Sequence, residues 1–451
     1  MNGRRWGLLS LAVLLSAGAG LAGEPERPDW SRCLKDIPLG PFRLDVGGSV
    51  RLRYEYRDDF NQQRYADQRR RDLESDHFVL QRTRLDFTLH FTENAHAFVQ
   101  VQDARAFDSD FKKDDFAMGC PYWNPVDLRQ AYIEWLHIAD TPFGLKVGRQ
   151  AIFYGDNRIW GPGEWGNVGR YTWDAAKLII DTPCAEVHGI FANQVAYDPH
   201  SFDEHESDLD AFGIYAMVKK LPFKLDLFWV GKNTRPRIVA NARGDTVNLD
   251  THTVGFRIDG TLGRGWDYGG TLARTFGERN GVDVEAYGAN ARLGYTFPCP
   301  WNPRIGIEYS HATGDPNAAG GDFETFDGVF GAIDKYYGRI NFFAWMNLQD
   351  IQFSFSVQPV RKLKVMVDYH FFRLDDRKDA WYWCNGQPAR RDATGRAGSS
   401  LGQEIDLVVS YRLGHHRFLA GYAHFFPGSF IERTGPSPDA DWLFFQCLYA
   451  F

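Results

Sequence analysis

The chain ends in the ten residues Trp442-Leu443-Phe444-Phe445-Gln446-Cys447-Leu448-Tyr449-Ala450-Phe451, and this stretch decides the fold. It is strand-like and aromatic, and it stops on phenylalanine. A soluble protein seldom leaves such a strand at its terminus, because a free apolar edge pairs with other chains. A closed barrel in a bacterial outer membrane removes the edge by pairing its last strand with its first. The alternative is a terminal strand docked on a soluble β-sandwich.

The beginning of the chain predicts export. Arg4 and Arg5 precede a short apolar core at 8–17, and the small residues Gly20 and Ala22 predict signal peptidase cleavage after Ala22. Export implies an oxidising compartment. We therefore expect a signal peptide over residues 1–22, a short periplasmic segment over 23–42 and a barrel over 43–451.

The composition also suits a barrel. No later stretch supplies the ~18 consecutive apolar residues of a transmembrane helix. The mean hydropathy is −0.40, yet aromatic residues make up 15% of the chain. Barrel strands alternate apolar and polar residues, so their mean hydropathy stays low. The net charge of −7 argues against a nucleic-acid partner.

Six cysteines are present, and none form a closely spaced pair typical of a metal site. We expect neither a metal nor another cofactor. Cys120 and Cys384 both fall in predicted outer gaps, where a disulfide between them is possible. Unpaired buried cysteines are an equally good interpretation, and the sequence does not choose.

Segments of about ten residues with period-two alternation or strong β-propensity number eighteen, which predicts an all-β fold, a single 18-stranded antiparallel transmembrane barrel. The gaps between them alternate short and long, and barrels place tight turns in the periplasm and long loops outside. With a periplasmic N-terminus we expect every short gap inside and every long gap outside. The predicted strands are 43–57, 77–92, 95–107, 127–137, 143–151, 172–181, 185–196, 207–219, 223–233, 248–259, 265–276, 284–297, 303–312, 349–359, 363–373, 402–412, 416–425 and 442–451.

Alternation assigns the two faces of the wall. In the first predicted strand Leu52 and Tyr54 point one way, and Arg51, Arg53 and Glu55 point the other. A lipid-facing Arg or Lys at the bilayer midplane costs about 2–4 kcal/mol, so the charged face must look inward. Eighteen strands enclose a lumen too wide for wall side chains to fill. We predict a water-filled or loop-plugged pore with a hydrated, charged lining.

The gap that follows the predicted strand 143–151 combines glycine, aromatic residues and opposite charges. Guanidinium groups bind carboxylates bidentately, and aromatic rings offer an apolar face to sugars. Arginines here and on the first two strands predict a positive strip that draws anions into the pore, with acids holding the arginines in place. The residues are Arg149, Asp156, Arg158, Arg170 and Asp174 around the gap, Arg51, Arg53, Arg82 and Arg84 on the strands, and the acids Asp86 and Glu134.

The same segment resembles the signature of the alginate-export porin family. Three later stretches are similar to the same family, so the likeness extends over roughly residues 40 to 451. It implies a monomeric 18-stranded barrel whose arginine-rich constriction passes an anionic polyuronate outward. By motif, Arg149, Asp156, Arg158, Arg170 and Asp174 would lie at the constriction, with Arg84 and Arg129 as additions. The later stretches are His311-Ala312-Thr313-Gly314-Asp315-Pro316, Thr325-Phe326-Asp327 and Gly421-Tyr422-Ala423-His424-Phe425-Phe426-Pro427-Gly428-Ser429.

The chain departs from this family at one place. Members dedicated to alginate secretion carry a long periplasmic plug between late strands, whereas the turn Leu413-Gly414-His415 is short. The alternative function is therefore a general or anion-selective porin for uptake of small organic acids or oligosaccharides. The expected partners are outer-membrane lipid, an anionic saccharide and, during insertion, the barrel-assembly machinery.

A surface adhesin or scaffold with the loops 313–348 and 374–401 as its working parts is another class, although loops are generally rich in the Gly, Asp and Asn found there. A further class is a barrel enzyme such as a lipase. It would need a serine and a histidine held together at the outer rim. His424 and Ser429 fall in that region, but no acid is evident in the sequence to orient the histidine. We predict that the protein is not an enzyme.

Overall fold

The computed structural model describes residues 30–59, 75–113, 120–234, 248–317, 320–332 and 336–451. The signal peptide expected over 1–22 lies outside this part of the chain. None of the described helices is long and apolar enough to cross a membrane.

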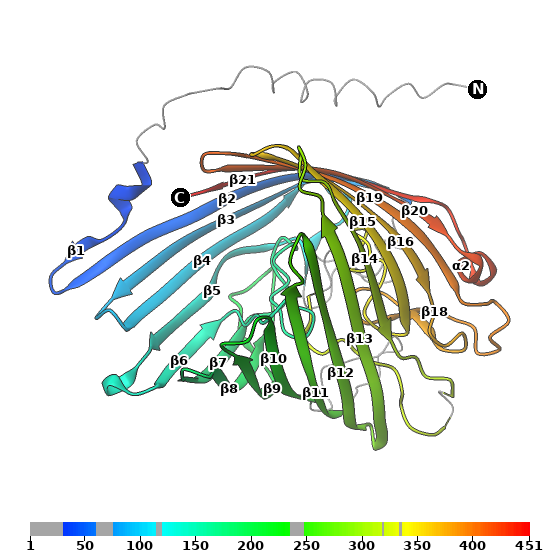
Figure 1. Ribbon diagram of the computed structural model, residues 1–451, viewed down its shortest axis with the longest axis horizontal. Coiled ribbons are helices and arrows are strands. Elements are labelled where there is room, and N and C mark those ends of the chain that lie inside the picture. Colours follow the sequence, from blue (N-terminus) through cyan, green and yellow to red (C-terminus); the bar gives the residue numbers. More distant parts are fainter. Residues whose placement is uncertain (1–29, 60–74, 114–119, 235–247, 318–319, 333–335) are drawn as a thin grey trace.

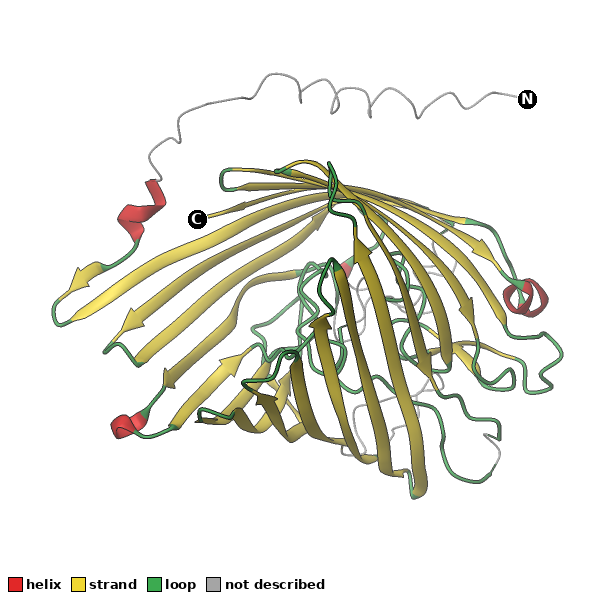
Figure 2. Cartoon of the chain, in the orientation of Figure 1, coloured by secondary structure: helices red, strands yellow, loops and turns green. Residues whose placement is uncertain are grey.

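Eighteen of the described strands form one antiparallel sheet that closes on itself (Figures 1 and 2). The strand at the C-terminal end pairs with the strand at the N-terminal end, with Ser49 opposite Ala450 and Asp58 opposite Asp441. The predicted all-β, 18-stranded barrel is confirmed. Its strands are β2 (Phe42–Asp58), β3 (Asp76–His90), β4 (Ala95–Phe107), β5 (Asn124–Trp135), β6 (Phe143–Gln150), β7 (Trp173–Asp181), β8 (Ala185–Val195), β9 (His205–Val218), β10 (Lys224–Thr234), β11 (Leu249–Thr261), β12 (Trp266–Arg279), β13 (Val282–Thr296), β14 (Arg304–Ala312), β15 (Leu348–Val360), β16 (Leu363–Arg373), β19 (Ser400–Leu413), β20 (His416–Pro427) and β21 (Ala440–Ala450).

The remaining elements are short. A 3-10 helix and a three-residue strand precede the barrel, and the strand folds back on the first residues of β2. A small hairpin lies within the loop 374–399. These elements are η2 (Trp30–Leu34), β1 (Ile37–Leu39), η6 (Ile138–Asp140), β17 (Ala380–Tyr382), β18 (Pro388–Arg391) and α2 (Ser429–Thr434).

The predicted strand ends agree with the observed ones to within three residues, but the rule that every short gap lies inside was wrong at one connection. β12 and β13 are joined by Asn280-Gly281, at the end of the barrel that carries the long loops. Both residues have left-handed backbones, with φ +52° and +76°. An Asn-Gly pair supplies the tight turn whose twist matches a hairpin, so the strands run on to Arg279 and Val282.

The two faces of the wall are as alternation predicts. Leu52 and Tyr54 are 50% and 40% exposed on the outer surface, whereas Arg51 and Arg53 are only 3% and 2% exposed. In β15 the outward Phe353 is likewise exposed. The outer surface is therefore an apolar band suited to lipid.

The lumen is not the hydrated channel that its charges predicted. Three outer loops, 151–172, the described residues of 313–347, and 374–399, fold into the barrel (Figure 2). Their aromatic residues pack against one another and the wall. Trp160 meets Phe330 at 5.3 Å between ring centroids, and Phe343 meets Trp381 at 5.8 Å. The loop-plugged alternative is the correct one, because long loops fill a space that the wall cannot.

An arginine placed on the lipid-facing wall should be costly. We expect Phe353→Arg to lower the free energy of unfolding by about 2–4 kcal/mol, because Phe353 lies near the middle of β15 and a cation there would face hydrocarbon. Urea titration of protein folded into lipid bilayers measures the loss, with Phe353→Leu as the control. Equal stability of the two variants would contradict the assigned face.

Candidate functional site

The loop 151–172 carries a compact turn, residues 163–169, against the inner wall. The backbone N–H groups of Arg170 and Tyr171 both donate to the carbonyl of Pro162, at 2.7 and 3.2 Å, and close this turn. Gly163 and Gly169 have φ of +61° and +103°, which residues with a Cβ rarely adopt. The glycines of this segment therefore let the chain reverse inside the lumen.

Five arginines of the wall converge on this turn. Arg51 and Arg82 lie directly opposite each other across β2 and β3. Arg51 donates to the carbonyls of Trp165 and Gly166 at 3.1 and 2.9 Å, and Arg82 donates to those of Glu164 and Gly166 at 3.1 Å each. The backbone of the turn thus supplies the acceptors that these buried guanidinium groups need. This arginine cluster consists of Arg51, Arg53, Arg82, Arg84 and Arg129.

Glu164 is the carboxylate that the cluster surrounds. Its Oε2 accepts a 2.6 Å hydrogen bond from Arg84 and lies 3.6 Å from Arg82, while its Oε1 lies 3.4 Å from Arg129. Desolvation by the surrounding protein would raise the pKa of Glu164, but Arg84, Arg129 and Arg82 outweigh it and hold the pKa well below its usual range. The Glu164 side chain is nevertheless 43% exposed, whereas that of Arg84 is 12% exposed.

Two kinds of acceptor hold the arginines of this cluster. Glu55 lies 2.7 Å from Arg53, and Glu164 pairs with Arg82, Arg84 and Arg129. Backbone carbonyls of the turn accept further hydrogen bonds from Arg51, Arg53 and Arg82.

An aromatic ring lies beside the arginines. The Arg53 guanidinium stands 4.3 Å above the ring of Trp165, which also contacts the edge of Phe444 at 5.2 Å. A fixed indole next to guanidinium groups presents an apolar face and charged donors together. This pairing suits a ligand that is both a sugar ring and a carboxylate.

The predicted residues Asp156 and Arg158 lie apart from this cluster. Arg158 is buried beneath the loop 313–347, where it pairs with Asp156 at 3.2 Å, with Glu308, and with Ser310 at 3.1 Å. Gly161 N–H donates to Phe330 O and Phe330 N–H to Ile159 O, both at 3.0 Å. Arg158 thus fastens one inner loop to another and to the wall.

The remaining predicted residues also have protein partners. Arg149 makes a two-bond pair with Asp174, at 2.9 and 3.1 Å. Arg170 donates to the carbonyl of Cys384 at 3.3 Å. Glu134 lies nearer the periplasmic turn 136–142, 3.9 Å from Lys146. Asp86 accepts a 2.8 Å hydrogen bond from Gln100.

The arginines predicted on the strands therefore lie together in the structure. They surround Glu164, a residue that the sequence did not single out. Its signal was an acid between Gly163 and Gly166 in a segment already singled out for its arginines.

Comparison with known proteins fits this architecture. Residues 42–442 match the family described as alginate export. The chain belongs to the alginate export family. No curated protein sequence matches the chain.

Solved structures share the fold of this alginate-export chain at low sequence identity. OccAB2 of Acinetobacter baumannii has a TM-score of 0.58 at 13% identity, covering 90% of this chain and 98% of that one. OpdQ of Pseudomonas aeruginosa has a TM-score of 0.55 at 12% identity, covering 90% and 97%. OccK8 (OprE) of the same organism has a TM-score of 0.56 at 13% identity, covering 90% and 98%. The chain is a channel of the Gram-negative outer membrane.

Family membership indicates a channel and not an enzyme. The expectation that no acid orients His424 was wrong, because β21 places Asp441 opposite it, with 2.8 Å between His424 Nδ1 and Asp441 Oδ1. No contact among the described residues joins Ser429 to His424. Cys120 is a free cysteine buried beside Phe78, so the possible bridge to Cys384 is not formed.

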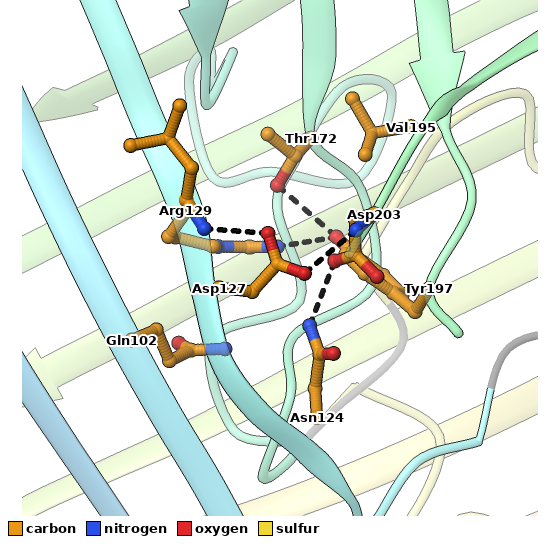
Figure 3. A pocket seen from close by; sticks show the side chains of 9 residues that line it. Gln102, Asn124, Asp127, Arg129, Thr172, Val195, Tyr197 and Asp203 are labelled. Carbon is orange, nitrogen blue, oxygen red and sulfur yellow. Dashed lines mark hydrogen bonds between the residues drawn. The ribbon is translucent and has the colours of Figure 1, made fainter. Parts of the chain in front are cut away.

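A second polar group lies next to Arg129, between β5 and the outer loop 196–204 (Figure 3). Asp203 accepts hydrogen bonds from Asn124 at 2.7 Å and from the backbone of Asp198 at 2.9 Å, and its own N–H donates to Asp127 at 2.7 Å. Burial and the neighbouring Asp127 raise the pKa of Asp203 to about 7. The charged form of Asp203 is therefore disfavoured in the folded protein.

This shift predicts a pH dependence. The pKa of Asp203 rises from 3.8 to about 7 on folding, so its contribution to stability is lost as the pH rises from about 4 to about 7. We expect Asp203→Asn to be more stable relative to wild type at pH 8 than at pH 5. Urea midpoints in detergent micelles at the two pH values measure this.

Asp198 is the control, since hydrogen bonds from Ser201 and from the backbone lower the pKa of that partly exposed carboxylate. Asp198 is therefore ionised in the folded and the unfolded chain at both pH values, and the stability of Asp198→Asn relative to wild type should be the same at pH 5 and pH 8. A change with pH as large as that of Asp203→Asn would contradict the assigned pKa shift of Asp203.

Proposed function

We propose that this channel passes anionic saccharides, alginate-like polyuronates above all, outward through the arginine cluster. The observation that carries the proposal is the convergence of five wall arginines on the turn 163–169 inside a plugged lumen, three of them on the carboxylate of Glu164. Membership of the alginate export family supports the choice of polymer.

The chemistry of a polyuronate fits this cluster. Each sugar carries a carboxylate that planar guanidinium forks can bind, and each ring has an apolar face suited to Trp165. Because several arginines lie side by side, each carboxylate of the polymer would move from one guanidinium group to the next. Conduction requires that each contact be weak enough to release.

The other predicted constriction residues take supporting roles in this proposal. Asp174 and Asp156 would hold Arg149 and Arg158 in position, and Arg170 and Glu134 would lie along the approach to the cluster. Arg158 would act by fixing the inner loops, since its guanidinium is buried among Asp156, Glu308 and Ser310.

One observation favours a second candidate, an anion-selective porin for uptake of small organic acids or oligosaccharides. Every periplasmic turn lies in the described residues, and none exceeds seven residues. The turn between β19 and β20 is only Gly414-His415. None of the periplasmic turns between the described strands is therefore long enough to act as a plug around a polymer.

Removing cluster arginines tests the proposal. We expect the double variant Arg82→Gln/Arg84→Gln to lose anion selectivity and to weaken block by hexagalacturonate at least about tenfold, because each charge-assisted hydrogen bond contributes about 1.5–3 kcal/mol. Planar-bilayer reversal potentials and current block measure both effects.

Arg304→Gln is the matched control, because Arg304 also lies on the inner wall and pairs with Asp267 at 2.7 Å, but near the periplasmic turn 297–303. Selectivity unchanged in the cluster variant would reject the proposal. Equal block of the wild-type channel by galacturonate monomer and hexamer would favour the uptake porin.

A further inference from the structure

Glu164 occupies the place that a ligand carboxylate would take in the arginine cluster. We propose that it is a tethered competitor, which sets how strongly the channel selects a polymer over single uronates. This inference rests on the proposed function, since it assumes that the cluster binds uronates.

The contacts of Glu164 are those expected of a bound carboxylate. Its two oxygens meet guanidinium groups from two strands, Arg84 of β3 at 2.6 Å and Arg129 of β5 at 3.4 Å. A carboxylate with two oxygens shared between separate arginines is the arrangement that a uronate would reproduce. Glu164 and a ligand therefore compete for the same donors.

The side chain can leave without moving the loop. The turn is fastened by its backbone, because Arg51 donates to Gly166 at 2.9 Å and Arg53 to Trp165 at 2.8 Å. Asn167 adds side-chain hydrogen bonds to three carbonyls, including that of Tyr122 at 2.9 Å. The Glu164 side chain is 43% exposed, so a rotation toward solvent would release the donors of Arg84 and Arg129 that it occupies, while Arg84 keeps Gln102 and Arg129 keeps Tyr197 as partners.

Competition from Glu164 discriminates between ligands by the number of carboxylates that each ligand carries. A tethered acid is present at a high effective concentration, so a single small anion is largely excluded. A polymer brings a second carboxylate to the neighbourhood as soon as the first is bound, and it competes on equal terms. Glu164 would thus admit polyuronates and reject monomers.

The test removes the charge of Glu164 in the full-length channel. We expect Glu164→Gln to lower the Kd for galacturonate monomer about tenfold, which corresponds to a site vacant for roughly a tenth of the time in the wild type. The Kd for hexagalacturonate should fall less, so that the Kd of the monomer divided by the Kd of the hexamer becomes smaller than in the wild type. Current block in planar bilayers gives both values.

Glu285→Gln is the matched control, because Glu285 makes a two-bond pair with Arg274 at 2.8 Å on the exposed outer face of the barrel. It should change neither affinity. An unchanged monomer Kd in Glu164→Gln would overturn the proposal, as would weaker binding, which would mean that Glu164 positions the arginines.

A second variant keeps the test decisive if Glu164→Gln fails to fold, as judged by heat-modifiable gel mobility. Glu164→Asp retains the charge but is one methylene shorter, so it should reach Arg84 and Arg129 less well and give a smaller gain in monomer affinity. Failure of the proposed function is distinguishable, because Arg82→Gln/Arg84→Gln would then leave block by hexagalacturonate unchanged. If current block by uronates depends on the arginines but not on Glu164, the role of Glu164 is refuted and the proposed function stands.

Discussion

The structure depends on one constraint, that backbone polar groups at membrane depth must find their hydrogen bonds within the protein. The pairing of β21 with β2 meets it by leaving no strand edge. Closure with eighteen strands then creates an interior that wall side chains cannot fill. The inner loops follow from that width, and they bring aromatic residues and carbonyl groups to places that water would otherwise occupy.

The inner loops change what the wall charges can do. A guanidinium covered by protein loses its hydration and needs acceptors in return. The turn 163–169 offers its carbonyls, so Arg51 and Arg82 are stabilised while keeping their charge. Had carboxylates filled those places, each guanidinium would face a fixed negative charge. Backbone acceptors satisfy the buried guanidinium groups without adding negative charge, which is what the proposed anion pathway would require.

The alternation of apolar and polar residues predicted the barrel because each strand of the wall has one face toward lipid and one toward the lumen. Alternation in residues such as Leu52 and Arg53 is fixed by the two faces of the wall, and the strand ends followed. The Asn280-Gly281 turn was missed because the expected gap was drawn from strand propensity, which overlooked a two-residue hairpin signal. The same alternation predicted which arginines of the strands face the lumen. Glu164 was not, since its importance comes from contacts with β3 and β5 that no sequence period encodes.

The residues of the loop 151–172 differ in how firmly their contacts hold them. Arg158, near the start of the loop, is locked among Asp156, Glu308 and Ser310, and the backbone of residues 164–166 is held by the wall. The Glu164 side chain, in contrast, is paired with wall arginines and 43% exposed. A channel must keep its selective groups fixed and yet exchange what they bind. In the function that we propose, the arginines and the loop backbone would be the fixed part, and the Glu164 carboxylate would be the part that exchanges.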